Sequence, residues 1–234
     1  MPDEIVVTVS WGPREETPTR CAERLLDSLS RIPALPDVYS DWYLYPEGGA
    51  DGPDDLLPVP TDLDALASLL GAGVLRNDRG ATMPGSGFSS VLTRLHRDRP
   101  IDYRVRCGVE SSRVSNHILL KFPHPNRADP AAIDENIVQQ SLMALVEAWQ
   151  PEYGSAITHS FRTAQKINHK AKEIPVGWVT YLANSVAIDE PKLPDLSRIT
   201  RTGDGMLLQL HGIVQEPSLD EALGIRRALG YEVQ

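Results

Sequence analysis

Apolar and polar residues alternate over residues 5–10, and the apolar positions there are Val and Ile. Alternation of β-branched residues predicts a strand. The pattern then changes to the period of a helix, whose apolar face comprises Ala22, Leu25, Leu26, Leu29 and Ile32. Thr17 is a suitable N-cap residue, Pro18 suits the first helical position, and Pro33 and Pro36 end the helix. The first elements of the chain are therefore a strand and a helix.

Similar patterns predict elements along the rest of the chain. Strands are predicted over 41–46, 88–96, 101–109, 116–122, 155–162, 177–183, 197–202 and 205–212. Helices are predicted from Thr61 or Asp62 to Gly71, over about 131–149, and over 218–229, where Ser218 and Glu221 match a capping box. The stretches 47–55 and 83–87 are predicted loops because of their Gly, Pro, Asp and Ser content. In 101–109, Arg104 and Arg106 alternate with apolar residues, which indicates one solvent-facing side.

Strands and helices do not alternate regularly in this pattern, as they would in a parallel βαβ fold. The sequence therefore predicts an α+β fold, with a largely antiparallel mixed sheet and three to four packing helices. One domain spanning residues 1–234 is expected, because a chain of 234 residues can build one large core. Two short echoes, VTVSWG with YRVRCG and DWYLY with GWVTYL, suggest two loosely related halves, although echoes this short also arise by chance.

The charged residues divide the chain into regions of opposite sign. The formal net charge of -9 argues against a general nucleic-acid binder or a protein of anionic membranes. Residues 37–64 hold eight acids and no Lys or Arg, whereas residues 76–127 hold ten bases and four acids. Separated signs suit a protein partner that is itself charged. The alternative is that the acidic stretch is only a solvated loop.

The two cysteines, Cys21 and Cys107, lie far apart and in no metal-binding spacing, which fits a reduced cytoplasmic protein. The first ten residues contain acids and no base, so no signal peptide is expected. No apolar run approaches the roughly 18 residues that span a bilayer. The expected location is the cytoplasm.

No catalytic, cofactor-binding or metal-binding motif stands out. Trp11-Gly12-Pro13 lies between a strand and a helix but lacks a nucleophile, a base and a glycine-rich anion cradle, so we interpret it as a structural corner. PGSGFSS does not supply a Gly-x-Ser-x-Gly elbow. The six histidines have no tight ligand spacing, so neither a metal nor a cofactor is predicted. The alternative of a small enzyme with a His/Asp site assembled in space, using His159 or His169, stays open.

Five segments carry a resemblance to a known family. They are SWGPREETPTRCAERLLDSL, DWYLYP, RCGVESSRVSNHILLKFP, LMALVEAWQPEYG and PVGWVTYLA. In this order they resemble immunity protein family 52 of bacterial polymorphic toxin systems, and the likeness runs from residue 7 to about residue 183. The insert PEGGADGPDDLLPVP and the loop QKINHKAKEIP depart from the family pattern. The shared motifs resemble core positions, so none is carried over as a binding residue.

The resemblance implies a non-enzymatic cytoplasmic protein that neutralises a cognate toxin delivered by neighbouring cells, often through contact-dependent or type VI secretion. The implied partner is a nuclease toxin of the restriction-endonuclease fold, bound as protein to protein, with no direct nucleic-acid or membrane contact. Both a monomer and a dimer are compatible with the sequence. The alternatives are the small enzyme described above and a structural subunit of a secretion or phage-tail apparatus.

The acidic stretch supplies the candidate toxin-binding residues. A nuclease binds phosphates in a positive channel, and an inhibitor can use carboxylates against that field. The candidates are Asp41, Glu47, Asp51, Asp54 and Asp55, with Tyr43 and Tyr45 as aromatic anchors.

Overall fold

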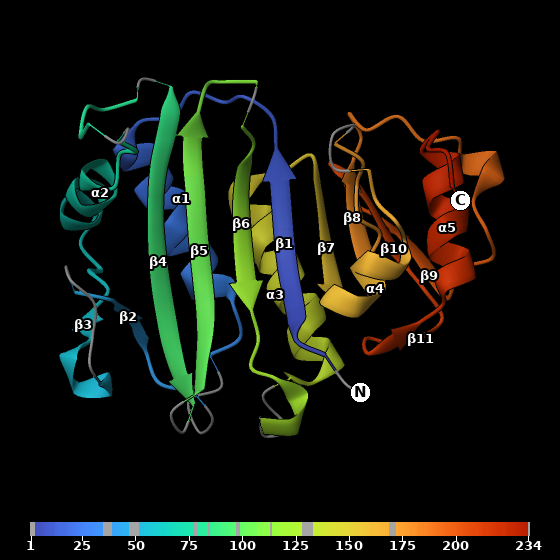
Figure 1. The fold of residues 1–234 in the computed structure, drawn as a ribbon, viewed down its shortest axis with the longest axis horizontal. Coiled ribbons are helices and arrows are strands. Elements are labelled where there is room, and N and C mark those ends of the chain that lie inside the picture. Colours follow the sequence, from blue (N-terminus) through green and yellow to red (C-terminus); the bar gives the residue numbers. More distant parts are fainter. Residues whose placement is uncertain are drawn as a thin grey trace.

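The computed structural model describes residues 3–34, 39–46, 52–76, 79–83, 85–96, 99–112, 114–127, 133–168 and 172–233. Its main feature is a ten-stranded sheet with the strand order β3-β2-β4-β5-β6-β1-β7-β8-β10-β9, in which every neighbouring pair is antiparallel (Figure 1). The strands are β1 (Ile5–Trp11), β2 (Trp42–Leu44), β3 (Leu57–Pro58), β4 (Ser86–His96), β5 (Arg99–Val109), β6 (Asn116–Lys121), β7 (Tyr153–Thr158), β8 (Val179–Ala183), β9 (Arg198–Arg201) and β10 (Gly205–Gln209). A separate hairpin pairs β11 (Gly212–Ile213) with β12 (Glu216–Pro217). The predicted α+β fold with a largely antiparallel sheet is confirmed.

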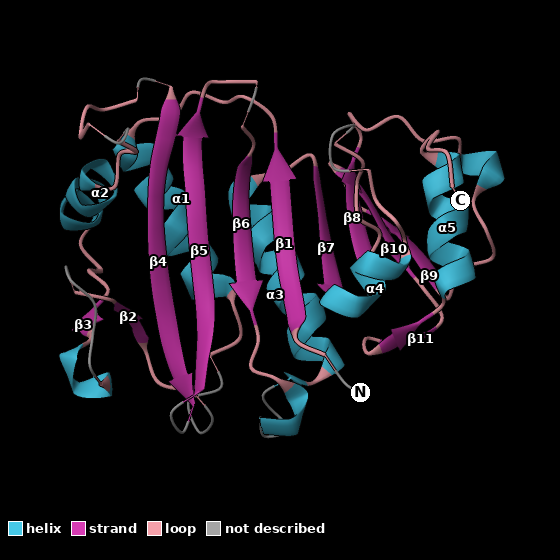
Figure 2. Cartoon of the chain, in the orientation of Figure 1, coloured by secondary structure: helices cyan, strands magenta, loops and turns pink. Residues whose placement is uncertain are grey.

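The helices of the described residues are α1 (Pro18–Arg31), α2 (Leu63–Ala72), α3 (Glu135–Trp149), the short α4 (His159–Ala164) and α5 (Leu219–Ala228) (Figure 2). Three of them begin at the predicted caps. The side chain of Thr17 accepts from Arg20 N, that of Asp62 from Ala65 N, and that of Ser218 from Glu221 N. Each cap satisfies a backbone N–H that has no partner inside its helix.

One face of the sheet packs against α1, α2 and α3. The residues of β1 that alternate toward these helices are buried: Ile5, Val7, Val9 and Trp11. They share one hydrophobic cluster with Leu25 of α1, Leu66 of α2 and Leu142 of α3. Figures 1 and 2 show α1 and α3 behind strands β4, β5, β6 and β1. The period-2 and period-3.6 patterns of the sequence therefore meet in one core layer.

The opposite face of the sheet is covered at the C-terminal strands. Ile157 of β7, Leu182 of β8 and Leu208 of β10 form a second cluster with Phe161 of α4 and Ile225 of α5. Strands β7, β8 and β10 are thus packed on both faces, which explains why nearly all of their residues are buried.

The same side of β2, β4, β5, β6 and β1 carries no helix in the described part of the chain. Paired residues of antiparallel strands point to one face, so the pairings Val91↔Arg104 and Arg104↔Leu119 place these three side chains on it. Arg106 and His117 pair two residues further along β5 and β6 and so lie on the same face. We call this surface the open face.

Several predicted element boundaries are wrong; for example, β4 begins at Ser86, inside the predicted loop 83–87, and the predicted strand 205–212 ends at Gln209. The predicted strand 155–162 ends at Thr158, whose side chain accepts from Phe161 N and starts α4 instead. Gly71 does not end α2, because the C-cap residue is Gly73. The predicted helix over 131–149 begins only at Glu135, after the N-cap Asp134.

The single domain over 1–234 and the relation between two halves stay predictions. Among the described residues, no helix is long and apolar enough to cross a membrane. Both cysteines are free and buried.

Candidate functional site

The predicted toxin-binding residues that the structure describes lie at the β2–β3 edge of the sheet. Asp41 is exposed directly before β2, and Asp54 and Asp55 are exposed in a 3-10 turn, Pro53–Asp55, directly before β3. Glu47 and Asp51 lie outside the described residues. Asp55 Oδ2 accepts from Gly52 N at 3.1 Å, so that carboxylate also holds its own turn.

Strand β2 separates the aromatic residues of this edge between the two faces. Leu44 is buried on the core face, and Trp42 packs against the same cluster, edge-on to Tyr103. Tyr43 pairs with Thr93 on the open face, and Tyr45 is 44% exposed. Tyr43 and Tyr45 are therefore placed where a partner can reach them.

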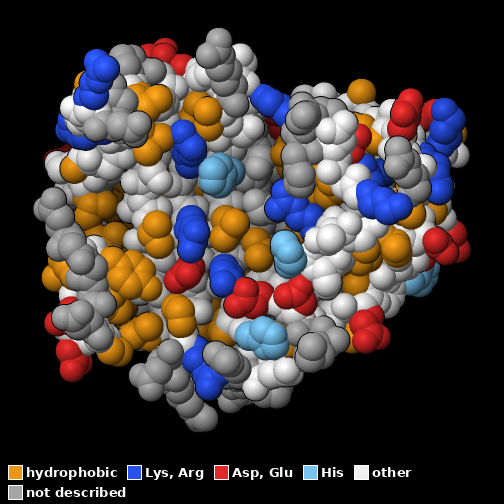
Figure 3. Space-filling view, viewed as in Figure 1, with side chains coloured by type: hydrophobic (Ala, Val, Ile, Leu, Met, Phe, Trp, Pro, Cys, Tyr) orange, Lys and Arg blue, Asp and Glu red, His pale blue; other side chains and the backbone are white. Residues whose placement is uncertain are grey.

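Apolar side chains gather over β2 and β4 in the space-filling view (Figure 3). Val91 is exposed on the same face, two residues along β4 from Thr93, the partner of Tyr43. Toward the middle of the sheet, the same view shows Lys, Arg and His side chains with Asp and Glu side chains among them. The acidic β2–β3 edge and the basic residues of β5 therefore belong to one sheet. Alternation along 101–109 indicates only the part of this arrangement that lies in a single strand.

The Trp-Gly-Pro corner packs against the end of α3. Trp11 is 3% exposed, and its ring stacks on that of Trp149 with centroids 5.6 Å apart and an interplanar angle of 25°. The Arg14 guanidinium lies over Trp11, 4.6 Å from the ring centroid. This supports the interpretation of a structural corner, because the indole is covered on both sides.

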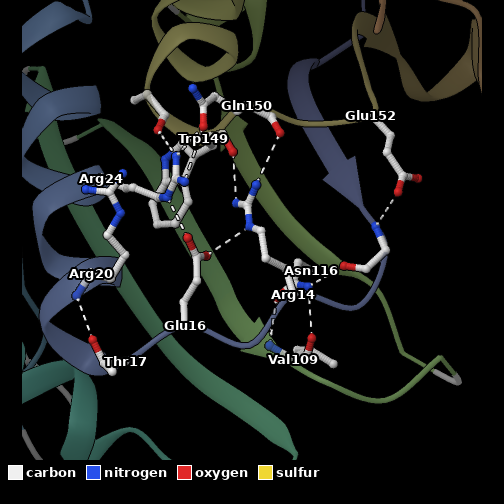
Figure 4. A network of polar contacts seen from close by, with 12 residues as sticks. Arg14, Glu16, Thr17, Arg20, Arg24, Val109, Asn116, Trp149, Gln150 and Glu152 are labelled. Atoms are coloured by element: carbon white, nitrogen blue, oxygen red, sulfur yellow. Dashed lines mark hydrogen bonds and ion pairs between the residues drawn. The ribbon is translucent and has the colours of Figure 1, made fainter. Parts of the chain in front are cut away.

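Two arginines bind the C-terminal carbonyls of α3 (Figure 4). Arg14 donates to Trp149 O at 2.8 Å and to Gln150 O at 3.2 Å, and Arg24 donates to Ala148 O at 2.8 Å. These carbonyls have no partner inside the helix, and positive charge is favourable at the negative end of the helix dipole. Gln150 ends the helix with φ 50°, in the left-handed region.

Glu16 bridges the two arginines. Its Oε1 lies 2.6 Å from Arg24 Nε and its Oε2 lies 3.1 Å from Arg14 Nε, with the Glu16 side chain only 6% exposed. Burial lowers the pKa of Arg14, and Glu16 opposes that shift. The arrangement neutralises buried charge and satisfies a helix end, so its geometry is that of a structural clamp rather than of an acid/base pair.

Asn116 joins the corner to β5 and β6. Its side-chain amide donates to Gly12 O at 2.7 Å, and its Oδ1 accepts from Val109 N at 2.8 Å. Arg14 N donates in turn to Val109 O at 2.8 Å. The segments SWGPREET, RCGVESSRVSN and VEAWQPEYG therefore converge at one place in the fold. Sequence reasoning missed this role, since single residues far apart give no local signal.

Tyr103 completes the buried polar contacts of the core. Its hydroxyl accepts from Trp149 Nε1 at 2.9 Å and lies 2.8 Å from Ser28 Oγ. Burial raises the pKa of Tyr103, so the hydroxyl stays protonated. Tyr103 faces the core rather than a cleft. Its contacts with Ser28 of α1 and Trp149 of α3 position these two helices on the sheet.

Of the two histidines considered for an alternative enzyme, the structure describes only His159. His159 is exposed at the start of α4, and His169 lies outside the described residues. His211 Nδ1 lies 2.9 Å from Glu221 Oε1, but Glu221 also accepts from His211 N and so ties the strand end to α5. In the described ranges, no group of three His, Cys, Asp or Glu side chains could hold a metal ion.

Clefts do occur elsewhere on the described surface. One of about 540 Å³ lies between α3 and β8 and is lined by Glu147, Glu152 and Asp204 among others. Another, of about 660 Å³, lies beside the start of α1 and is lined by Glu15, Glu16 and Glu110 among others. Neither of these two is lined by a histidine, so the structure offers no support there for a His/Asp site.

Comparison with known proteins agrees with the family resemblance of the sequence. A family model described as immunity protein 52 (Imm52) matches residues 4–212. Among solved structures, the T6SS protein PA0821 of Pseudomonas aeruginosa is similar, with 14% sequence identity and a TM-score of 0.50, over 97% of this chain and 72% of that one. At that identity the likeness concerns the fold alone. The search of curated proteins found no match.

Proposed function

Because the chain belongs to the immunity protein 52 family, we propose that it neutralises a cognate secreted toxin by stoichiometric binding and occlusion. The observation that carries this proposal is the family match over residues 4–212. The proposed site of action is the cytoplasm. A stable complex of this kind buries roughly 1,200–2,000 Å² in total.

The proposed toxin is a nuclease, and type VI secretion is its proposed route of delivery. The charge of the β2–β3 edge supports the first point, because exposed Asp41, Asp54 and Asp55 suit the positive channel of a phosphate-binding enzyme. The fold shared with a T6SS protein supports the second. Tyr43 and Tyr45 are the proposed anchors, since aromatic side chains often contribute most at the centre of an interface.

Co-expression with the toxin encoded beside this gene tests the proposal. Growth should be restored, and a 1:1 complex should co-purify. Adding the pure protein to a fixed amount of toxin and measuring toxin activity distinguishes occlusion from enzymatic inactivation. If the mechanism is occlusion, inhibition is complete at one protein molecule per toxin molecule. Inhibition that is complete at one molecule per ten toxins would show turnover and would replace occlusion with an enzymatic mechanism. Failure to restore growth with any neighbouring toxin would contradict the proposal.

A further inference from the structure

The open face is built of residue rows that run across the strands. One row joins Val91 of β4, Arg104 of β5 and Leu119 of β6. The next row places Arg106 beside His117. In both rows a positive or titratable group lies near the middle of the sheet, and Arg104 has apolar neighbours on both sides. Figure 3 shows the basic side chains in this region at the molecular surface.

The positive charge of these rows is only partly balanced. Arg104 is 57% exposed, and its nearest carboxylate oxygen, Asp102 Oδ2, lies 3.9 Å away, at the limit of an ion pair. Lys121 is paired with Glu4 at 2.9 Å. Among the described residues, none supplies Arg106 with a carboxylate. Two arginines therefore have guanidinium groups available to an external carboxylate, with which they can bond bidentately.

Polar atoms on this face are also shielded without a partner. Arg106 Nε, Asp102 Oδ1 and Thr93 Oγ1 are buried from water and make no hydrogen bond with a described residue. The side chains of the open face therefore pack closely enough to shield polar atoms from water. On β7, β8 and β10 the corresponding face is covered by α4 and α5. The open face is therefore the part of this side of the sheet that no described helix covers.

We propose that the open face is a docking surface for an acidic segment of the cognate toxin. Carboxylates of that segment bind Arg104 and Arg106, and apolar side chains of the segment pack on Val91 and Leu119 at either side of Arg104. This inference rests on the proposed function and specifies a second contact beside the acidic edge. The toxin thus presents a positive region to the β2–β3 edge and a negative segment to the middle of the sheet.

The charge pattern favours a protein over a nucleic acid as the occupant. Asp102 and Glu4 lie within the same surface, next to Arg104 and Lys121 respectively. A polyphosphate that followed the strands would meet these carboxylates, whereas a protein segment can place its acids only opposite the arginines. The net charge of -9 acts in the same direction.

Charge reversal tests the proposal. The toxin is the inactive variant of the one identified by growth rescue, and its Kd is measured by calorimetry. We expect the pair Arg104→Glu and Arg106→Glu to weaken binding at least about tenfold, because like charges then face each other. The pair Arg104→Lys and Arg106→Lys keeps the charge but loses the bidentate geometry, so it should weaken binding clearly less than the reversed pair does. If the reversed pair does not fold, Arg104→Glu alone serves, since Arg104 is exposed.

The control pair is Arg198→Glu and Arg201→Glu, two exposed arginines on β9 at the far end of the sheet. It produces the same change in net charge and should bind as wild type does. If the reversed pair loses less than tenfold in affinity, or if the control pair loses as much, the open face is not the docking surface. The proposed function still holds in that case, provided that the wild-type protein restores growth. Tight binding of a DNA oligonucleotide to wild type, in competition with toxin, would also overturn the docking surface. If wild type itself does not bind toxin, the proposed function fails as well.

Discussion

Trp11 and Trp149 stack at the place where the first strand, the following corner and the end of α3 meet. Trp11 is 3% exposed. We expect Trp11→Ala to lower the free energy of unfolding by roughly 3–5 kcal/mol, because a large buried ring is lost and a cavity is left. Urea denaturation measures this change.

The Trp11 indole N–H is buried, and no described residue accepts a hydrogen bond from it. Trp11→Phe keeps the stacked ring and removes that N–H, so it should cost clearly less than Trp11→Ala. Both folded variants should still bind the toxin. An Ala variant with unchanged stability and no toxin binding would move Trp11 from the core to the interface.

Glu16→Gln should destabilise the protein by about 3 kcal/mol, because it leaves Arg14 and Arg24 without their shared counter-charge. The matched control is Glu23→Gln, which removes the carboxylate of the exposed pair with Arg20. That variant should unfold at the wild-type denaturant concentration. Equal effects of the two substitutions would show that Glu16 does not act as a buried bridge.

Stability should fall as the pH is lowered below about 6.5, in part through His117. Burial lowers the pKa of His117, the hydrogen bond to Ser115 O opposes this, and neighbouring Arg106 adds to it. Between the two pKa values the unfolded state binds more protons, so the stabilisation is present above the unfolded pKa and is lost as the pH falls. Denaturation of wild type and His117→Gln from about pH 7.5 to about pH 5.5 checks this: the variant should depend less on pH.

Arg106→Gln supplies the second arm of the pH experiment. Removing the nearby positive charge should move the pKa of His117 back toward its ordinary value and reduce the loss of stability in acid. Identical pH profiles for wild type and both variants would assign the acid sensitivity to other groups.

Cys21 and Cys107 should be unreactive in the folded protein. Both are buried, and the Cys21 thiol together with burial raises the pKa of Cys107. Because the thiolate is the reactive form, a disulfide reagent such as dithionitrobenzoate should label neither cysteine in native protein and both in guanidinium. Rapid native labelling would contradict the core position of this pair.

The acidic edge makes a kinetic prediction. Replacing Asp51, Asp54 and Asp55 with Asn should slow association with the toxin and flatten its salt dependence, with little effect on folding. Stopped-flow association at two salt concentrations measures both effects.

The control for the acidic edge neutralises three exposed acids elsewhere: Glu216→Gln, Asp220→Asn and Glu232→Gln. It should associate as wild type does. If the acidic-edge variant is equally unaffected at both salt concentrations, recognition lies elsewhere, and the open face becomes the principal surface.

Local signals explain which parts of this fold the sequence predicts. Thr17, Asp62 and Ser218 cap their helices through residues three positions on, so their role is visible in the sequence. The start of α4 is not visible in the sequence, because the stretch after Ala156 continues a strand-like pattern. Its first turn is also fixed from a distance by Asp3, whose Oδ2 accepts from Ser160 N at 2.6 Å.

The candidate sites show the same limit. The acidic stretch and the alternation of Arg104 and Arg106 can be read from neighbouring residues. The clamp cannot, since Arg14 reaches a carbonyl 135 residues away. The open face also depends on which strands are covered by helices, and no periodicity within one strand contains that information.

The central position of β1 has a consequence for synthesis. Thr8 bonds to Ile118 O, 110 residues later, and β1 then pairs with β7 on its other side. On the ribosome, this Val- and Ile-rich segment has neither partner strand until residues 116–121 and 153–158 have emerged. Such a high contact order slows folding, because long loops must close before the pairing stabilises them. Strand β1 therefore cannot take its central place in the sheet until residues up to 158 have been synthesised.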